Sequence, residues 1–169
     1  MTAVEERWLD ERQMQAWLRL VAVTEILPAT LDARLRRVSG LTHFEYQVLA
    51  MLSESPDRTL QMSWLARRTN ASLPRLSHVV RRLDERGLVQ RRPSEADRRA
   101  TDAVLTEAGW QTVVAAAPDH VATVREHVVD VLTDVQLQQV STAMAAILAS
   151  LDPEGHLTQA PAGAAEEPG

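Results

Sequence analysis

The 169-residue sequence contains no cysteine and no lysine, and phenylalanine and tyrosine occur once each. Without cysteine, the protein has no disulfides, no thiolate ligands for zinc and no sensor based on cysteine oxidation. Long apolar runs are also missing from the first twenty residues, which carry Glu5, Glu6, Asp10 and Glu11 instead. Neither a signal peptide nor a membrane span fits that pattern, so the sequence predicts a cytoplasmic protein with no membrane partner.

The sequence patterns of common enzyme active sites are missing as well. There is no glycine-rich phosphate loop and no serine in a G-x-S-x-G turn, so we predict that the protein is not an enzyme. His120 and His127 lie on one side of a predicted helix, but seven residues separate them by about 10.5 Å along the helix axis, too far to share one ion. We therefore predict neither a metal nor a cofactor, and a metal-responsive regulator remains an alternative.

Charge is distributed unevenly along the chain, although the net charge is only −5. Residues 57–99 hold eleven arginines and five acidic residues, a local net charge of +6, whereas both flanking segments are acidic. A basic segment of this kind is typical of a surface that binds nucleic acid.

Hydrophobic residues recur at helical spacing in six segments, approximately 5–38, 43–54, 61–69, 73–86, 107–132 and 134–151. Pro28 is expected to kink or split the first helix, and Pro118 is expected to bend the fifth. N-caps are predicted at Thr42 and Thr133, which open capping boxes with Glu45 and Gln136, and at Thr59 and Thr106. Residues 152–169 are rich in Ala, Pro, Gly and Glu and read as a disordered tail.

The middle of the chain predicts a helix-turn-helix followed by a hairpin. The turn at residues 70–72 joins the short helix to the helix at 73–86, whose polar face carries several arginines. Residues 88–92 and 101–105 both suit strands, and the polar residues 93–100 between them suit a protruding loop. The predicted fold is therefore mainly α with a small β-hairpin wing: a winged helix-turn-helix lobe plus a helical dimerisation region.

Two strings in this region resemble the MarR family of bacterial transcriptional regulators. They are LARRTNASLPRLSHVVRRLDERGLVQRR at 65–92 and DRRATDAVLTEAG at 97–109, and the resemblance covers roughly residues 5–151. The second string fits the family's D-x-R, then L-T-x-x-G, pattern through Asp97, Arg99, Leu105, Thr106 and Gly109. The resemblance implies one domain over 1–151, with dimerisation helices at 5–40 and 107–151 and a winged DNA-binding lobe at 41–106.

The same resemblance places a recognition helix, starting near Ser72, in the major groove of DNA and a wing arginine in the adjacent minor groove. Arg75 and His78 then project from the first turns, where side chains reach base edges, and Arg67, Arg68, Arg81 and Arg82 are placed for phosphates. Asp97 is expected to pair with a wing arginine and stabilise the wing. The predicted DNA-binding residues are Ser72, Pro74, Arg75, Ser77, His78, Arg81, Arg82, Arg98 and Arg99.

The partners implied by the resemblance are double-stranded DNA, a second copy of the chain and a small lipophilic or phenolic effector bound between the dimerisation helices and the lobe. The expected activity is repression from a pseudo-palindromic operator. The alternative is a winged-helix module that binds another protein. The four tryptophans, Trp8, Trp17, Trp64 and Trp110, are expected to be packing residues, with the first, second or fourth as an alternative lining for an effector pocket.

Overall fold

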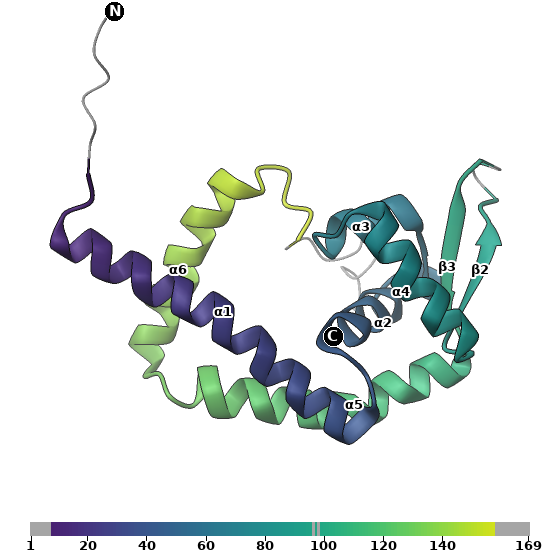
Figure 1. Ribbon diagram of the computed structural model, residues 1–169, viewed down its shortest axis with the longest axis horizontal. Coiled ribbons are helices and arrows are strands. Elements are labelled where there is room, and N and C mark those ends of the chain that lie inside the picture. The colour runs from purple at the N-terminus through teal and green to yellow at the C-terminus, as the bar shows by residue number, and fades with distance from the viewer. Residues whose placement is uncertain (1–7, 96, 98, 158–169) are drawn as a thin grey trace, which may run out of the picture.

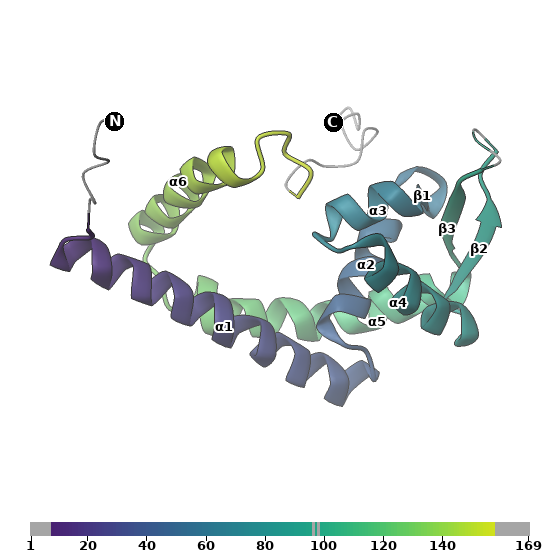
Figure 2. The same ribbon diagram turned by 45° about the horizontal axis from the view of Figure 1, so that its top comes forward.

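A computed structural model describes residues 8–95, 97 and 99–157. It consists of a lobe, which contains α2, α3, α4 and a small sheet, of two long helices, α1 and α5, that extend from the lobe, and of a third, α6, that follows the far end of α5 (Figures 1 and 2). The elements in chain order are α1 (Glu11–Ser39), α2 (His43–Ser53), a 3₁₀ turn η1 (Pro56–Arg58), β1 (Thr59–Gln61), α3 (Met62–Arg68), α4 (Leu73–Glu85), β2 (Val89–Pro93), β3 (Thr101–Leu105), α5 (Glu107–Val124), a π-helical turn η2 (Arg125–Val129) and α6 (Asp134–Leu151). The predicted fold class, mainly helical with a winged lobe, is confirmed.

Side-chain caps set the starts of the long helices. The capping boxes predicted at Thr42 and Thr133 are both present, and the Thr106 hydroxyl caps α5. The first helix begins at Glu11 and not near residue 5, because Asp10 forms a capping box with Gln13. Residues 5–7, at the start of the predicted 5–38 range, lie outside the described residues.

Pro28 does not split α1, which runs without interruption from Glu11 to Ser39. A proline removes one helical hydrogen bond, and the neighbouring turns of α1 keep theirs. The second half of α1 also buries Leu31 and Leu35 and packs along α5. Pro118 likewise lies inside α5, and the helix changes to π-helical hydrogen bonding only at Arg125–Val129.

The sheet has three strands in the order β1-β3-β2, all antiparallel. The predicted hairpin of β2 and β3 is therefore confirmed, but the predicted helix cap at Thr59 is wrong. Thr59 lies in β1 opposite Val104, and Gln61 precedes α3 without a side-chain cap. A strand of three residues shows no alternation of its own, and its partner is distant in sequence, so local patterns do not reveal it.

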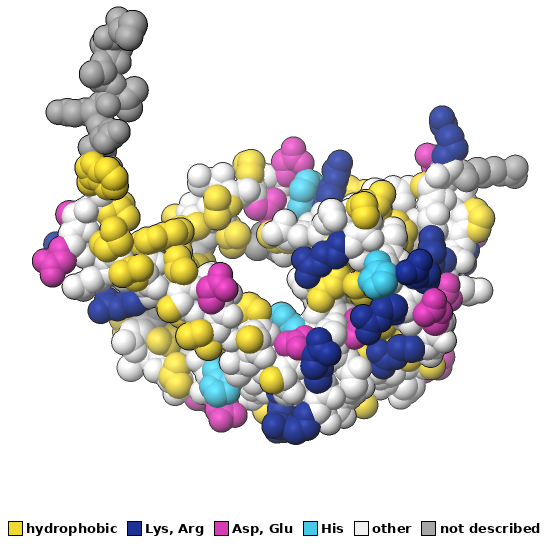
Figure 3. Space-filling view, viewed as in Figure 1, with side chains coloured by type: hydrophobic (Ala, Val, Ile, Leu, Met, Phe, Trp, Pro, Cys, Tyr) yellow, Lys and Arg dark blue, Asp and Glu magenta, His cyan; other side chains and the backbone are white. Residues whose placement is uncertain are grey.

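The buried core lies in the lobe, between α2, α3, α4, the sheet and the start of α5. Its fully buried large side chains are Leu35, Leu41, Val48, Leu49, Leu52, Leu65, Leu76, Val80, Leu83 and Val89. By contrast, α6 buries no residue at all, and α1 buries only Leu31 and Leu35. The long helices therefore expose apolar side chains, many of them along α1 (Figure 3).

Three of the four tryptophans are not packed into this core. Trp8, Trp17 and Trp64 are largely exposed, and only Trp110 packs against the core cluster. The predicted packing role is therefore met within the single chain by Trp110, whereas Trp8, Trp17 and Trp64 do not pack into this core.

The predicted tail lies mostly outside the described residues. Its first part, 152–157, forms a turn in which the Asp152 carboxylate accepts hydrogen bonds from the backbone N–H groups of His156 and Leu157. The His156 ring meets the Trp64 ring edge-on, with the centroids 5.7 Å apart, so this turn reaches back to α3. In the described part of the chain, no helix combines the length and apolar character needed to cross a bilayer.

Candidate nucleic-acid interface

The turn between α3 and α4 gives the second helix its start. Asn70 adopts a left-handed conformation with φ of 48°, which asparagine tolerates better than most residues. Two residues later the Ser72 hydroxyl accepts the backbone N–H of Arg75 at 3.4 Å and caps α4. Pro74 fits in the first turn, because the amides there have no partner inside the helix.

The faces of α4 divide cleanly between core and solvent. Leu73, Leu76, Val80 and Leu83 recur at 3-4-3 spacing, which predicts one apolar face. Leu76, Val80 and Leu83 are fully buried, whereas Leu73 in the first turn is 48% exposed. The opposite side carries Pro74, His78 and Arg81, and the His78 Nδ1 atom lies 2.9 Å from the Arg81 guanidinium. Arginine side chains, dark blue in the space-filling view, gather over this lobe (Figure 3). The lobe thus presents a helix with exposed polar and cationic groups.

One flank of α4 is fastened to α2 through a buried carboxylate. Glu45 is only 1% exposed, and its Oε1 lies 3.1 Å from the Arg82 guanidinium while its Oε2 lies 3.9 Å from that of Arg86. The same carboxylate accepts the backbone N–H of Thr42 at 2.8 Å. Arg82 is predicted to contact phosphate, and in the structure it also forms an ion pair that fastens α4 to α2 while its side chain remains 49% exposed.

Arg75 lies on the same flank, two turns closer to the start of α4 than Arg82. Its guanidinium carbon is 4.4 Å from the centre of the Phe44 ring, a cation–π distance. Sequence reasoning missed both Phe44 and Glu45 as partners of α4. The capping box identified Glu45 as a local residue only, because nothing in a single sequence indicates which helix packs against α2.

The two arginines of α3 differ in position. The Arg67 guanidinium lies 5.8 Å from the centre of the exposed Trp64 ring and remains at the surface. Arg68 is only 8% exposed, so it does not lie at the surface as a phosphate contact requires. A helix of seven residues has only about two turns, so its hydrophobic periodicity does not show which of these two arginines is buried.

The tip of the wing is organised by Asp97. Its carboxylate accepts the backbone N–H of Arg99 at 2.9 Å and lies 3.7 Å from the Arg99 Nε atom, and its carbonyl accepts the N–H of Ala100 at 2.8 Å. The Arg99 side chain is 95% exposed. Asp97 therefore shapes the turn that presents Arg99 to solvent. Arg98, the other predicted wing arginine, lies outside the described residues.

The L-T-x-x-G string joins the wing to α5. The Thr106 hydroxyl donates to the Gly87 carbonyl at 2.7 Å and accepts the N–H of Gly109 at 3.0 Å, while the Thr106 N–H donates to the Leu88 carbonyl at 3.1 Å. A Cβ atom on Gly109 would lie 2.1 Å from that Leu88 carbonyl oxygen. Threonine and glycine are thus both required for the close approach of α5 to the start of β2.

A stacked pair of histidines lies where the lobe meets α5. The rings of His43 and His120 are 6.0 Å apart and stack, and the Tyr46 ring is 4.6 Å from His120. The backbone N–H of His43 donates to the Asp32 carboxylate of α1 at 2.9 Å. Burial lowers the pKa of both histidines, which favours neutral rings in this packed position.

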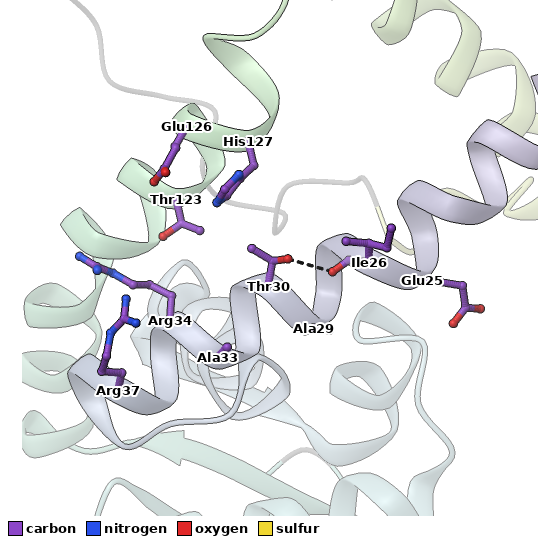
Figure 4. Close-up of a pocket in the computed structure, with 10 residues that line it drawn as sticks. All are labelled: Glu25, Ile26, Ala29, Thr30, Ala33, Arg34, Arg37, Thr123, Glu126 and His127. Carbon is purple, nitrogen blue, oxygen red and sulfur yellow. Dashed lines mark hydrogen bonds between the residues drawn. The ribbon is translucent and has the colours of Figure 1, made fainter.

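His127 lies in η2, away from that pair, and lines an open hollow of about 770 Å³ between α1 and the junction of α5 with η2 (Figure 4). Arg34, Arg37 and Glu126 also line it. His120 and His127 therefore face different surroundings and do not form one site. The described residues contain no group of three or more His, Asp or Glu side chains placed to hold a metal ion.

Comparison with known proteins agrees with this geometry. A model of the MarR family matches residues 39–100, and no curated protein gives a significant match. The solved structure of Sco3205, a MarR family transcriptional regulator from Streptomyces coelicolor in complex with DNA, is 35% identical, with a TM-score of 0.84 over 89% of this chain and 94% of that one. AbsC, a MarR family transcriptional regulator from the same organism, is 39% identical, with a TM-score of 0.82 over 87% of this chain and 99% of that one.

A more distant structure shares the fold. CouR from Rhodococcus jostii RHA1, solved bound to p-coumaroyl-CoA, is 21% identical, with a TM-score of 0.70 over 82% of this chain and 92% of that one.

The geometry of α4 and the wing and the two nearer relatives support the same family assignment. The chain belongs to the MarR family of transcriptional regulators and is a winged-helix DNA-binding protein.

Proposed function

We propose that this regulator binds a pseudo-palindromic operator as a homodimer and represses the genes beside it. The observation that carries the proposal is the capped helix α4, which exposes polar and cationic side chains next to a wing whose Arg99 side chain is 95% exposed. In this arrangement α4 enters the major groove and Arg99 reaches the adjacent minor groove, where the negative potential attracts arginine. Ser72, Pro74, Arg75, Ser77, His78 and Arg81 form the face of α4 that meets DNA.

The unburied helix α6 supports the dimer. An amphipathic helix is stable in water when its apolar face is covered, yet Val135, Val140, Ile147 and Leu151 of α6 are all exposed in a single copy. The first half of α1 exposes Trp17, Leu18 and further apolar residues in the same way. A second copy supplies a matching surface by two-fold symmetry. We therefore assign 5–40 and 107–151 to dimerisation and 41–106 to DNA binding.

The dimer is tested by introducing a charge into α6. Val140→Glu should convert the dimer into a monomer, because it places an unpaired carboxylate in the proposed apolar interface. Gln139→Glu is the matched control, since it adds the same charge at an exposed polar neighbour and should leave a dimer. Sedimentation velocity gives the mass of each protein. A monomeric wild-type protein at micromolar concentration would contradict the proposal.

DNA binding is tested with fragments from upstream of the protein's own coding sequence and with genome-wide selection of bound fragments. A footprint should show a dyad whose half-site centres lie about one helical turn apart, because both recognition helices must meet the same side of the duplex. Reporter expression with and without the protein then distinguishes repression from activation. A protein that binds no DNA but captures another protein would favour the interaction-module alternative.

The wing gives a further prediction through Arg99→Ala. The side chain contributes nothing to the core, so folding and dimerisation should be unchanged. Loss of one cationic contact per subunit should reduce the slope of log affinity against log salt by up to about two. The salt dependence of operator binding measures this directly.

Asp97→Ala separates the two roles of the wing pair. If Asp97 braces Arg99, removing the carboxylate weakens DNA binding, whereas simple repulsion between Asp97 and phosphate predicts stronger binding after its removal. An unchanged salt slope in Arg99→Ala would show that the wing does not contact DNA.

A small effector is also part of the proposal, and the structure of CouR, which shares the fold, contains bound p-coumaroyl-CoA. We infer a phenolic or lipophilic ligand whose affinity depends on the spacing of the two recognition helices. Thermodynamic linkage then requires ligand and operator to change each other's affinity by the same factor. Calorimetric titrations of ligand with and without operator DNA test that equality. A ligand that releases DNA without this reciprocity would refute the two-state mechanism.

A further inference from the structure

A narrow groove separates the recognition helix from the wing. Its volume is about 200 Å³, and its lining includes Ser63 of α3, Leu73 and Ser77 of α4, and Arg91, Arg99 and Thr101 of the wing. In both ribbon views the strands of the wing stand next to α4 (Figures 1 and 2). The groove thus combines two cationic side chains from opposite sides of the wing loop with hydroxyl groups of the helix-turn-helix.

The strand register determines which arginine of β2 belongs to this groove. Arg91 lies opposite Ala103 and Arg92 lies opposite Asp102. Residues directly opposite in an antiparallel pair share one face of the sheet, and successive residues alternate between faces. Ala103 is fully buried in the lobe core, so Arg91 is on the face that looks toward α3 and α4. Arg92 is on the other face, across from a carboxylate.

Arg91 is also electrostatically available. It is exposed, and among the described residues no ion pair or hydrogen bond of its side chain is found, in contrast to Arg82 and Arg99. A cation that lies beside hydroxyl groups and a second guanidinium, with no acid in the groove lining, is a favourable place for an anion.

On the basis of the proposed DNA-binding function, we infer that this groove holds a phosphate of the DNA backbone and that Arg91 is its principal contact. The groove lies between the helix assigned to the major groove and the wing assigned to the minor groove, and the backbone between two such grooves must cross it. Arg91 binds the phosphate from the wing, the Ser77 hydroxyl donates from α4, and Arg99 at the rim of the groove continues into the minor groove. Arg92 makes no such contact.

The neighbouring arginines provide a matched pair of variants. Arg91→Ala should reduce the slope of log affinity against log salt by about 1.8 for a dimer, because one phosphate contact per subunit is lost. Arg92→Ala removes the same charge one residue away and should leave the slope nearly unchanged. Arg91→Lys should keep the slope, since a point charge also binds phosphate. Circular dichroism and sedimentation check that all variants fold and assemble as the wild type.

Phosphate ethylation locates the contact on the DNA. Ethylating the phosphate between the two occupied grooves should block binding of the wild-type protein, and Arg91→Ala should be insensitive to that modification. Equal loss of slope in Arg91→Ala and Arg92→Ala, or no loss in either, would overturn the inference while wild-type operator binding remained intact. A wild-type protein that binds no operator would overturn the proposed function itself, and the inference with it.

Discussion

Replacing Gly109 by alanine should destabilise the protein by about 2–3 kcal/mol, the cost of forcing an extra methyl group into a packed position. In most helices the same change is stabilising, because alanine has a higher helix propensity than glycine. Here the new Cβ would lie 2.1 Å from the Leu88 carbonyl oxygen and 2.6 Å from the Leu105 Cδ1 atom. The first of these is backbone and cannot rotate away, so α5 must shift relative to β2.

Urea unfolding of Gly109→Ala measures this effect, with Gly40→Ala as the control. Gly40 has φ of 66° and open space around its position, so alanine there carries only the left-handed backbone cost of about 1 kcal/mol. The Thr106 hydrogen bonds to Gly87 and Leu88 should also weaken. This should shift the wing relative to α5 and so lower the affinity for DNA. A neutral or stabilising Gly109→Ala would show that the contact between α5 and β2 is looser than described.

Arg75→Ala should cause the largest loss of operator affinity. A base-reading arginine is worth about 1–3 kcal/mol per half-site, so a dimer should lose about thirtyfold or more in affinity. Arg75 lies in the first turn of α4, from which side chains reach base edges, and its guanidinium rests on the Phe44 ring. The ring restricts the arginine without using its hydrogen-bond donors. Preference at one base position per half-site should also relax.

Binding to a panel of operators with single substitutions separates base reading from charge. Arg67→Ala is the control, because this arginine also lies over an aromatic ring but on α3. It should weaken binding evenly across the panel and reduce the salt slope. Phe44→Leu should cost less affinity than Arg75→Ala, since it removes the ring on which Arg75 rests and leaves the guanidinium that contacts the base. An even loss for Arg75→Ala would instead make Arg75 a phosphate contact.

Local signals were sufficient for much of the fold. The capping boxes at Thr42 and Thr133 use residues within one turn of each other, and the helical spacing of Leu76, Val80 and Leu83 requires only one side of α4 to be buried. The wing string was informative for a similar reason. Asp97 and Arg99 lie two residues apart, and Thr106 and Gly109 lie three apart, so their geometry is fixed within a short loop and a first helical turn.

Tertiary packing decided the remaining features, because it brings together segments whose contacts cannot be recognised from a single sequence. β1 is a strand only because β3 lies beside it, and Arg82 is an ion-pair partner only because the start of α2 packs against α4. Gly109 is required by a carbonyl of another element, and Arg91 differs from Arg92 only through a register set by the core. The sequence by itself determined the helices, the family and the basic face, since these depend on neighbouring residues. Which arginines of that face hold the lobe together and which remain available for DNA was decided by contacts between elements distant along the chain.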